Sequence, residues 1–315
     1  MSTLQTPTKE SPFGSITNND TTLIKRFLKE NYKINGTYEI NGTYDTYVIC
    51  ENNGTSNNSC NVVVVSVDGD VRVKNRKIES LTGGLFRFGA VSGDFNCSFC
   101  SNITNLEGAP KEVVGNFSCY ACKNLVTLKG APTDVGGSFR CDNCSKLVSL
   151  KGAPSEVGGS FYCDKCKLLV SLEGVPEEIN GHFSCFNCRN LLSLEGGPKK
   201  VGTCFSCCCC PKLTSLKGAP KEVGETFWCN ECIGLKSLEG APEKIITSFF
   251  CNHCSNLTSL EGAPREVGSC FDCSSCENLK TLRGGPEKVG GEVWCWNCKN
   301  LMIIGLYIDR YKIKL

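Results

Sequence analysis

Apolar residues along most of this chain fall at the same places every 22 residues. In one copy they are Phe139, Cys141, Cys144, Leu147, Leu150 and Val157. The first cysteine of each copy is Cys97, Cys119, Cys141, Cys163, Cys185, Cys207, Cys229, Cys251, Cys273 or Cys295, with no insertion between copies. A fixed short period predicts a solenoid, in which each copy stacks on the last and does not fold alone.

The spacing inside one copy predicts a short strand followed by bends. Phe139 and Cys141 are two residues apart, so they share one face of a strand. The side chains of the leucines that follow, Leu147 and Leu150, are also expected to point into the core around a bend. Gly152-Ala153-Pro154 is expected to form a turn, because proline fixes the backbone dihedral φ and lacks an N–H donor. We expect one short parallel strand from each coil, paired with its neighbours.

Residues outside the repeats follow other patterns. Residues 1–20 are polar and indicate a disordered lead-in. Residues 21–94 predict a helix with Leu23 and Phe27 on its apolar face, then strands, with turns at Gly36, Gly42 and Asp68-Gly69. This segment ends in a degenerate capping coil, in which Val71 occupies the position equivalent to Phe95, at a spacing of 24 residues rather than 22.

Residues 95–300 are the ten-coil solenoid, and residues 301–315 predict a C-terminal cap strand. This cap is less polar than an effective cap should be, so it is also a candidate surface for end-to-end self-association. The predicted fold class is therefore mainly β: a parallel β-solenoid of about ten 22-residue coils with an N-terminal α+β cap.

The composition of the chain limits the classes of function that it can have. Of the 315 residues, 34 are Lys or Arg and 32 are Asp or Glu, giving a net charge of +2 that does not favour nucleic acid. We find no apolar run long enough to span a membrane and no secretory signal in the N-terminal residues. The 26 cysteines repeat in step with the fold in a long chain without an export signal, which favours a cytoplasmic protein.

The run Phe-x-Cys-x-x-Cys-x-x-Leu-x-x-Leu resembles the leucine-rich repeat. Phe139 and Cys141 stand where that family has strand leucines, and Cys144 stands at its Asn-or-Cys position. The unit is also similar to repeat proteins of phages and large DNA viruses, from which it departs by a second cysteine in place of Asn. The resemblance implies a horseshoe or gently curved solenoid and no enzyme activity. A viral protein of this kind would lie in the host cytoplasm or in the virion.

Three interpretations of the cysteine pairs remain open. Both thiols can be small apolar core residues. Two pairs from adjacent coils can form a four-thiolate zinc site, although sites bridging alternate gaps would give a 44-residue pattern, and the flanks repeat at 22. Each pair can also be a redox dithiol or a disulfide, although we see no helix after Cys144 to activate it.

Two coils carry extra cysteines, of which Cys204, Cys208 and Cys270 should lie on the solvent side of the strand by alternation. If zinc is bound, the candidate ligands are Cys204, Cys207, Cys208, Cys209, Cys210, Cys270, Cys273 and Cys276. The single histidines His182 and His253 occupy non-equivalent places and are interpreted as surface residues.

Residues on either side of the first cysteine should point outward from the sheet. Large aromatic residues there are unusual on an exposed face and are enriched at interfaces. The candidate partner-binding residues are Tyr120, Arg140, Tyr162, Phe186, Trp228, Phe250, Trp294 and Trp296.

The chain shows no Ser-His-Asp set, phosphate loop or paired-acid constellation. The first hypothesis is a non-enzymatic scaffold that binds a protein, without a cofactor. The alternatives are a thiolate zinc protein and a disulfide-stapled structural protein.

Overall fold

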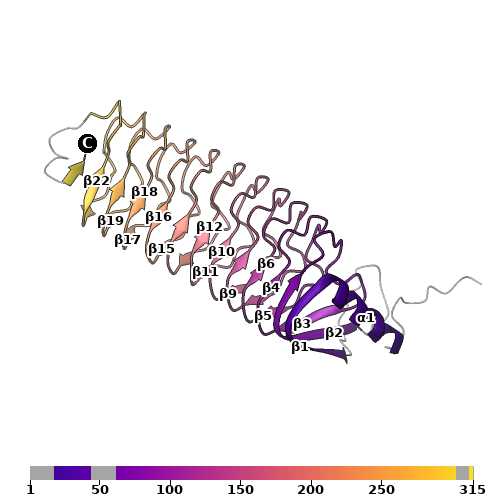
Figure 1. The fold of residues 1–315 in the computed structure, drawn as a ribbon. Helices are drawn as coiled ribbons and strands as arrows, with labels where there is room; N and C mark the ends of the chain where they lie inside the picture. The colour runs from indigo at the N-terminus through magenta and orange to yellow at the C-terminus, as the bar shows by residue number, and fades with distance from the viewer. Residues whose placement is uncertain (1–17, 44–61, 303–311, 315) are drawn as a thin grey trace, which may run out of the picture.

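The computed structural model describes residues 18–43, 62–302 and 312–314. Figure 1 shows an elongated stack of coils, with the N-terminal helix and long strands at one end. The fold is a parallel β-solenoid of about 22 residues per coil, as the hydrophobic period predicts. The lead-in predicted over residues 1–20 lies outside the described residues except for residues 18–20, which begin the helix. Residues 44–61, which include Cys50 and Cys60, and most of the C-terminal cap also lie outside the described residues.

The N-terminal end consists of α1 (Asn18–Asn31), β1 (Tyr32–Thr43), β2 (Val62–Val73) and β3 (Arg87–Val91). Strands β1 and β2 form an antiparallel ribbon, with Gly36 opposite Gly69. The turns predicted at Gly36, Gly42 and Asp68-Gly69 are wrong, because all of these residues lie inside β1 or β2. A Cβ on Gly36 would lie 1.9 Å from the carbonyl oxygen of Asp68, so glycine here permits close backbone contact rather than a reversal.

The first strand row begins at the Phe position of each coil. Val71 of β2 pairs with Phe95 of β4, so the capping segment continues the row at the predicted spacing of 24 residues. The strands of this row are β4 (Phe95–Asn96), β6 (Phe117–Ser118), β8 (Phe139–Arg140), β10 (Phe161–Tyr162), β12 (Phe183–Ser184), β14 (Phe205–Ser206), β16 (Phe227–Trp228), β18 (Phe249–Phe250), β20 (Phe271–Asp272), β22 (Glu292–Trp294) and β23 (Lys312–Lys314). Neighbouring coils pair in register, with each Phe beside the next.

A second strand row makes the prediction of one strand per coil wrong. It consists of β5 (Glu112–Val113), β7 (Asp134–Val135), β9 (Glu156–Val157), β11 (Glu178–Ile179), β13 (Lys200–Val201), β15 (Glu222–Val223), β17 (Lys244–Ile245), β19 (Glu266–Val267) and β21 (Lys288–Val289). In each strand from β5 to β19 the aliphatic residue is buried and the polar one points outward. Two residues are too few for a recognisable alternation, so the row is visible only once the coils are stacked.

The core repeats the same layers in every coil. Phe139, Cys141 and Leu147 are fully buried, as are their equivalents in the coils up to Leu279, whereas Leu301 in the last coil is partly buried. The phenylalanine rings from Phe95 to Phe271 form one column, with neighbouring centroids 4.9 to 5.8 Å apart. Each ring lies between two others, so the apolar surface of one coil is covered by the next coil rather than by a separate layer.

Candidate functional site

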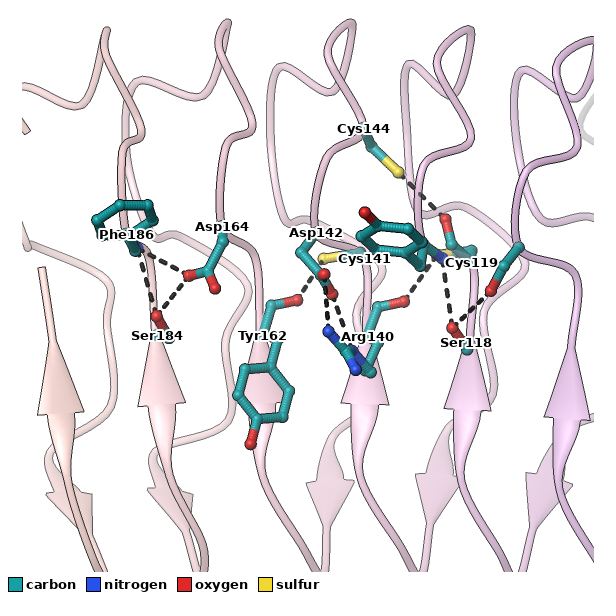
Figure 2. A network of polar contacts seen from close by, with 12 residues as sticks. Ser118, Cys119, Arg140, Cys141, Asp142, Cys144, Tyr162, Asp164, Ser184 and Phe186 are labelled. Atoms are coloured by element: carbon teal, nitrogen blue, oxygen red, sulfur yellow. Dashed lines mark hydrogen bonds and ion pairs between the residues drawn. The ribbon is translucent and has the colours of Figure 1, made fainter. Parts of the chain in front are cut away.

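The second cysteine of each pair makes a hydrogen bond between coils. The thiol of Cys144 donates to the carbonyl oxygen of Cys119 at 3.2 Å, as Figure 2 shows. Among the described residues, nine successive coils repeat this bond at 3.1 to 3.3 Å. The Cys119 carbonyl also accepts from the backbone N–H of Cys122 at 3.3 Å, whereas the thiol of Cys188 is the one donor to the Cys163 carbonyl among the described residues. Because a buried carbonyl without a partner is costly, the thiol there has a structural function beyond filling space.

The first cysteine bonds in the opposite direction along the stack. The thiol of Cys141 donates to the carbonyl oxygen of Tyr162 in the following coil at 3.5 Å (Figure 2). Among the described residues, six first cysteines make this bond, at 3.3 to 3.7 Å, and so tie their coils to the following coil as well. Because sulfur is a weak donor, each bond contributes little alone, but the ladder repeats it many times.

Burial favours the protonated form of some of the inward cysteines, as at Cys141 and Cys100. It raises the pKa of Cys141 well above its ordinary value, and it raises the pKa of Cys100 to about 12. Metal binding and redox chemistry both require the thiolate. The protonated thiol, by contrast, is the form that donates the inter-coil hydrogen bonds.

The 24 cysteines in the described part of the chain are free thiols, of which 20 are buried. In that part of the chain, no group of three or more His, Cys, Asp or Glu side chains has an arrangement that could hold a metal ion. The local geometry therefore matches the interpretation of the cysteines as core residues.

The cysteine-rich coil is less exposed than alternation suggested. Cys208 lies in the outward row, as alternation predicts, but the expected access to solvent is wrong, because the residue is buried and its thiol donates to Oδ1 of Asn230 at 2.8 Å. Cys204, Cys209 and Cys270 are partly exposed. Desolvation and the neighbouring Glu231 carboxylate raise the pKa of Cys209 to about 12, and desolvation raises that of Cys270 to about 11.

We use the name strand face for the two outward rows that flank the first cysteines. Arg140 lies between two tyrosine rings on this face. Its guanidinium lies 5.7 Å from the Tyr120 ring centroid and 5.0 Å from that of Tyr162. Two of its nitrogens donate to the carboxylate of Asp142 at 3.2 and 3.0 Å (Figure 2). Asp142 is only 4% exposed, so this pair is fixed in position before any partner arrives.

The next coils continue the network. Asp164 accepts hydrogen bonds from the Ser184 hydroxyl and from the backbone N–H of Phe186, and Figure 2 shows both. Desolvation raises the pKa of the Asp164 carboxyl. Lys165 lies over the Phe186 ring, with its Nζ 5.8 Å from the centroid. Polar groups along this face are therefore held mainly by neighbouring coils.

His182 belongs to this face, although its position in the repeat suggested an isolated surface residue. It is half-buried, with its ring centroid 5.6 Å from that of Tyr162 and 6.1 Å from that of Trp228. Burial lowers the pKa of the imidazole, which favours its neutral form. His182 therefore links aromatic residues that are three coils apart in the sequence. By contrast, His253 is exposed, as predicted.

Towards the C-terminal end the aromatic residues are more accessible. Trp228, Phe250 and Trp294 are half-buried, and Trp296 is 45% exposed. The indole N–H of Trp294 donates to Glu292 at 2.9 Å. The eight candidate residues thus all lie on the strand face with part of their surface accessible, spread along the stack rather than gathered in one pocket.

A hollow of about 350 Å³ lies at the N-terminal end of the strand face, and the sequence patterns did not indicate it. Its lining residues are Arg72, Arg76, Asn96, Ser98, Phe99, Ser118, Tyr120 and Arg140. It forms because Asn96 and Ser118 are short side chains between the long side chains of neighbouring strands. The only signal in the sequence was a pair of arginines just before the repeats.

Comparisons with protein-family models, with curated proteins and with solved structures found no match. In the described residues, no helix has the length and apolar character needed to cross a membrane. The candidate site therefore rests on the geometry of this chain.

Proposed function

We propose that this chain is a non-enzymatic repeat scaffold that binds a protein partner through the strand face. The observation that carries the proposal is the row of partly exposed aromatic residues around the fixed Arg140. Tyrosine, tryptophan and arginine dominate the energetics of protein interfaces, and a preorganised arginine loses little entropy on binding. The leucine-rich-repeat-like character inferred from the sequence is supported by the bond between the Cys144 thiol and the Cys119 carbonyl.

The alternative of a zinc protein receives no comparable support. A zinc site would need thiolates, whereas burial stabilises the neutral thiols. The inward thiols already donate to backbone carbonyls, so metal binding would break bonds between coils. We therefore propose a binding role that leaves the cysteine ladder intact, in the cytoplasm or in a virion.

The test is a selection from a random-peptide display library with the full chain immobilised. Selected peptides should lose at least about tenfold in affinity for a Tyr162→Ser/Trp228→Ser variant, since these rings lie at the centre of the strand face. The matched control is Val148→Ser/Leu192→Ser, which removes two exposed apolar residues, 45% and 57% accessible, from another side of the coil. Thermal melting must show that both variants remain folded. If the control weakens binding and the aromatic variant does not, the strand face is not the interface.

A further inference from the structure

The hollow at the N-terminal end of the strand face is lined by three guanidinium groups. They belong to Arg72, Arg76 and Arg140. Among the described residues that line the hollow, none is acidic. Arg140 is paired with Asp142, and Arg76 donates to the carbonyl oxygen of Ser98. Arg72 is exposed, and its guanidinium makes no hydrogen bond or ion pair within the described part of the chain, so its charge is available to a ligand.

A second basic residue lies beside this free charge. Lys33 of β1 is directly opposite Arg72 of β2 in the antiparallel ribbon, and it is also exposed. Directly opposed residues share one face of a sheet, and like charges in that arrangement are destabilising. A bound anion would relieve this repulsion.

The floor of the hollow includes neutral donor groups beside the guanidinium groups. The backbone N–H of Ser98 donates to Oδ1 of Asn96 at 3.0 Å, so the amide oxygen is occupied and the Asn96 NH₂ group faces away from it. The hydroxyls of Ser98 and Ser118 lie 2.7 Å apart, so one donates to the other and the second hydroxyl keeps a free proton. Two types of neutral donor therefore accompany the guanidinium groups.

One wall of the hollow is aromatic. Phe99 is 55% exposed, and its ring packs edge-to-face on Tyr120 with a centroid distance of 5.2 Å. Arg76 lies over Phe99 at 5.6 Å from the ring centroid. A ligand with an anionic head on an organic stem would therefore meet donors at the floor and apolar surface at the wall.

We propose that this hollow binds a phosphorylated side chain of the protein partner. A phosphate monoester carries close to two negative charges and three acceptor oxygens, which match several converging donors better than the two oxygens of a carboxylate. The inference rests on the proposed function, because it assigns the anion to the partner that the strand face binds. The aromatic residues further along would then contact the flanking peptide.

The test measures binding of the full chain to three degenerate peptide libraries by fluorescence anisotropy at one fixed salt concentration. The libraries are centred on phosphotyrosine, phosphoserine or unmodified tyrosine. At least one phosphorylated library should bind about tenfold or more tightly than the unmodified one. Arg72→Gln should remove most of that difference. Because the Arg72 side chain is exposed and makes no bond within the described residues, this variant is expected to fold normally.

The matched control is Arg189→Gln, which removes an exposed arginine bonded only to Asn187 in the described structure. Equal binding of all three libraries, or equal losses in Arg72→Gln and Arg189→Gln, would overturn the phosphate assignment. Competition by inorganic phosphate as effective as that of the phosphopeptides would also overturn it, since the peptide would then contribute nothing. If no phosphorylated library binds more tightly than the unmodified one while the displayed peptides still depend on Trp228, this inference fails and the proposed function stands.

Discussion

The cysteine at the second position of each pair does two things at once. Cys188 is fully buried, and its thiol donates to the carbonyl oxygen of Cys163 at 3.1 Å. An apolar residue of similar size would fill the space but leave that carbonyl without a partner. The residue type is therefore set by packing and by hydrogen bonding together.

Replacing this thiol tests the hydrogen bond separately from the packing. We expect Cys188→Val to lower the free energy of unfolding by about 1 to 3 kcal/mol, since a buried carbonyl loses its donor. Cys188→Ser keeps a donor and should cost less than Val. The measurement is the urea midpoint of each variant under reducing conditions. A serine variant less stable than the valine variant would show that apolar filling outweighs the bond.

Single residues show where prediction from sequence succeeds and where it stops. The burial of Phe139 and Cys141 followed from their spacing, because alternate residues of a strand share a face. Cys208 obeys the same alternation but is buried by Asn230 of the following coil. His182 also depends on its neighbours, since Tyr162 and Trp228 cover it. Neighbours across coils are fixed by stacking, which the pattern of one copy does not describe.

At the scale of elements, the ribbon of β1 and β2 differs most from what the sequence suggested. Glycine beside Asn or Asp is typical of hairpin turns. Here Gly36 and Gly69 instead permit two long strands to approach at the point where both have positive φ, +138° and +129°. Local composition could not distinguish a turn from such a crossing, because both need a residue without a Cβ.

A methyl group at this crossing should disrupt the ribbon. We expect Gly36→Ala to lower the free energy of unfolding by more than about 1 kcal/mol, because the added Cβ would collide with the Asp68 carbonyl. Amide hydrogen exchange should rise first in β1 and β2. The control is Thr37→Ala on the same strand, where the side chain is exposed. Equal exchange in the two variants would contradict the close approach.

At the scale of the molecule, stability is shared along a stack in which each coil contacts its two neighbours (Figure 1). The buried thiols extend through all ten cysteine coils. The pKa values of Cys141, Cys229 and Cys251 in the folded chain lie well above the ordinary value of 9.0, because these thiols are buried. Protonation of many equivalent groups is therefore coupled to folding.

The sign of this coupling predicts instability in alkali. Below the ordinary thiol pKa both folded and unfolded chains hold their protons, so the full stability is present. Above about pH 9 the unfolded chain loses thiol protons while the folded chain keeps them. Each such thiol then lowers the free energy of unfolding by up to about 1.4 kcal/mol per pH unit.

We expect the urea midpoint to be nearly constant from about pH 7 to 8 and to fall steeply towards about pH 10. The ultraviolet absorbance of thiolate should appear together with unfolding, which separates the cysteines from other groups that titrate in this range. Thiolate absorbance in the folded chain at about pH 9 would contradict the burial of the ladder.

The sequence by itself determined the period, the layers of the core and the solenoid, because each inward position recurs at a fixed interval and stacking is the arrangement that buries all copies. Tertiary structure decided which outward residues meet. The hollow of Arg72, Asn96 and Arg140 and the pairing of His182 with Trp228 join residues from different coils. Such contacts depend on side-chain length and on register across strands. A repeat pattern specifies neither, because it records what the copies share and not how they differ.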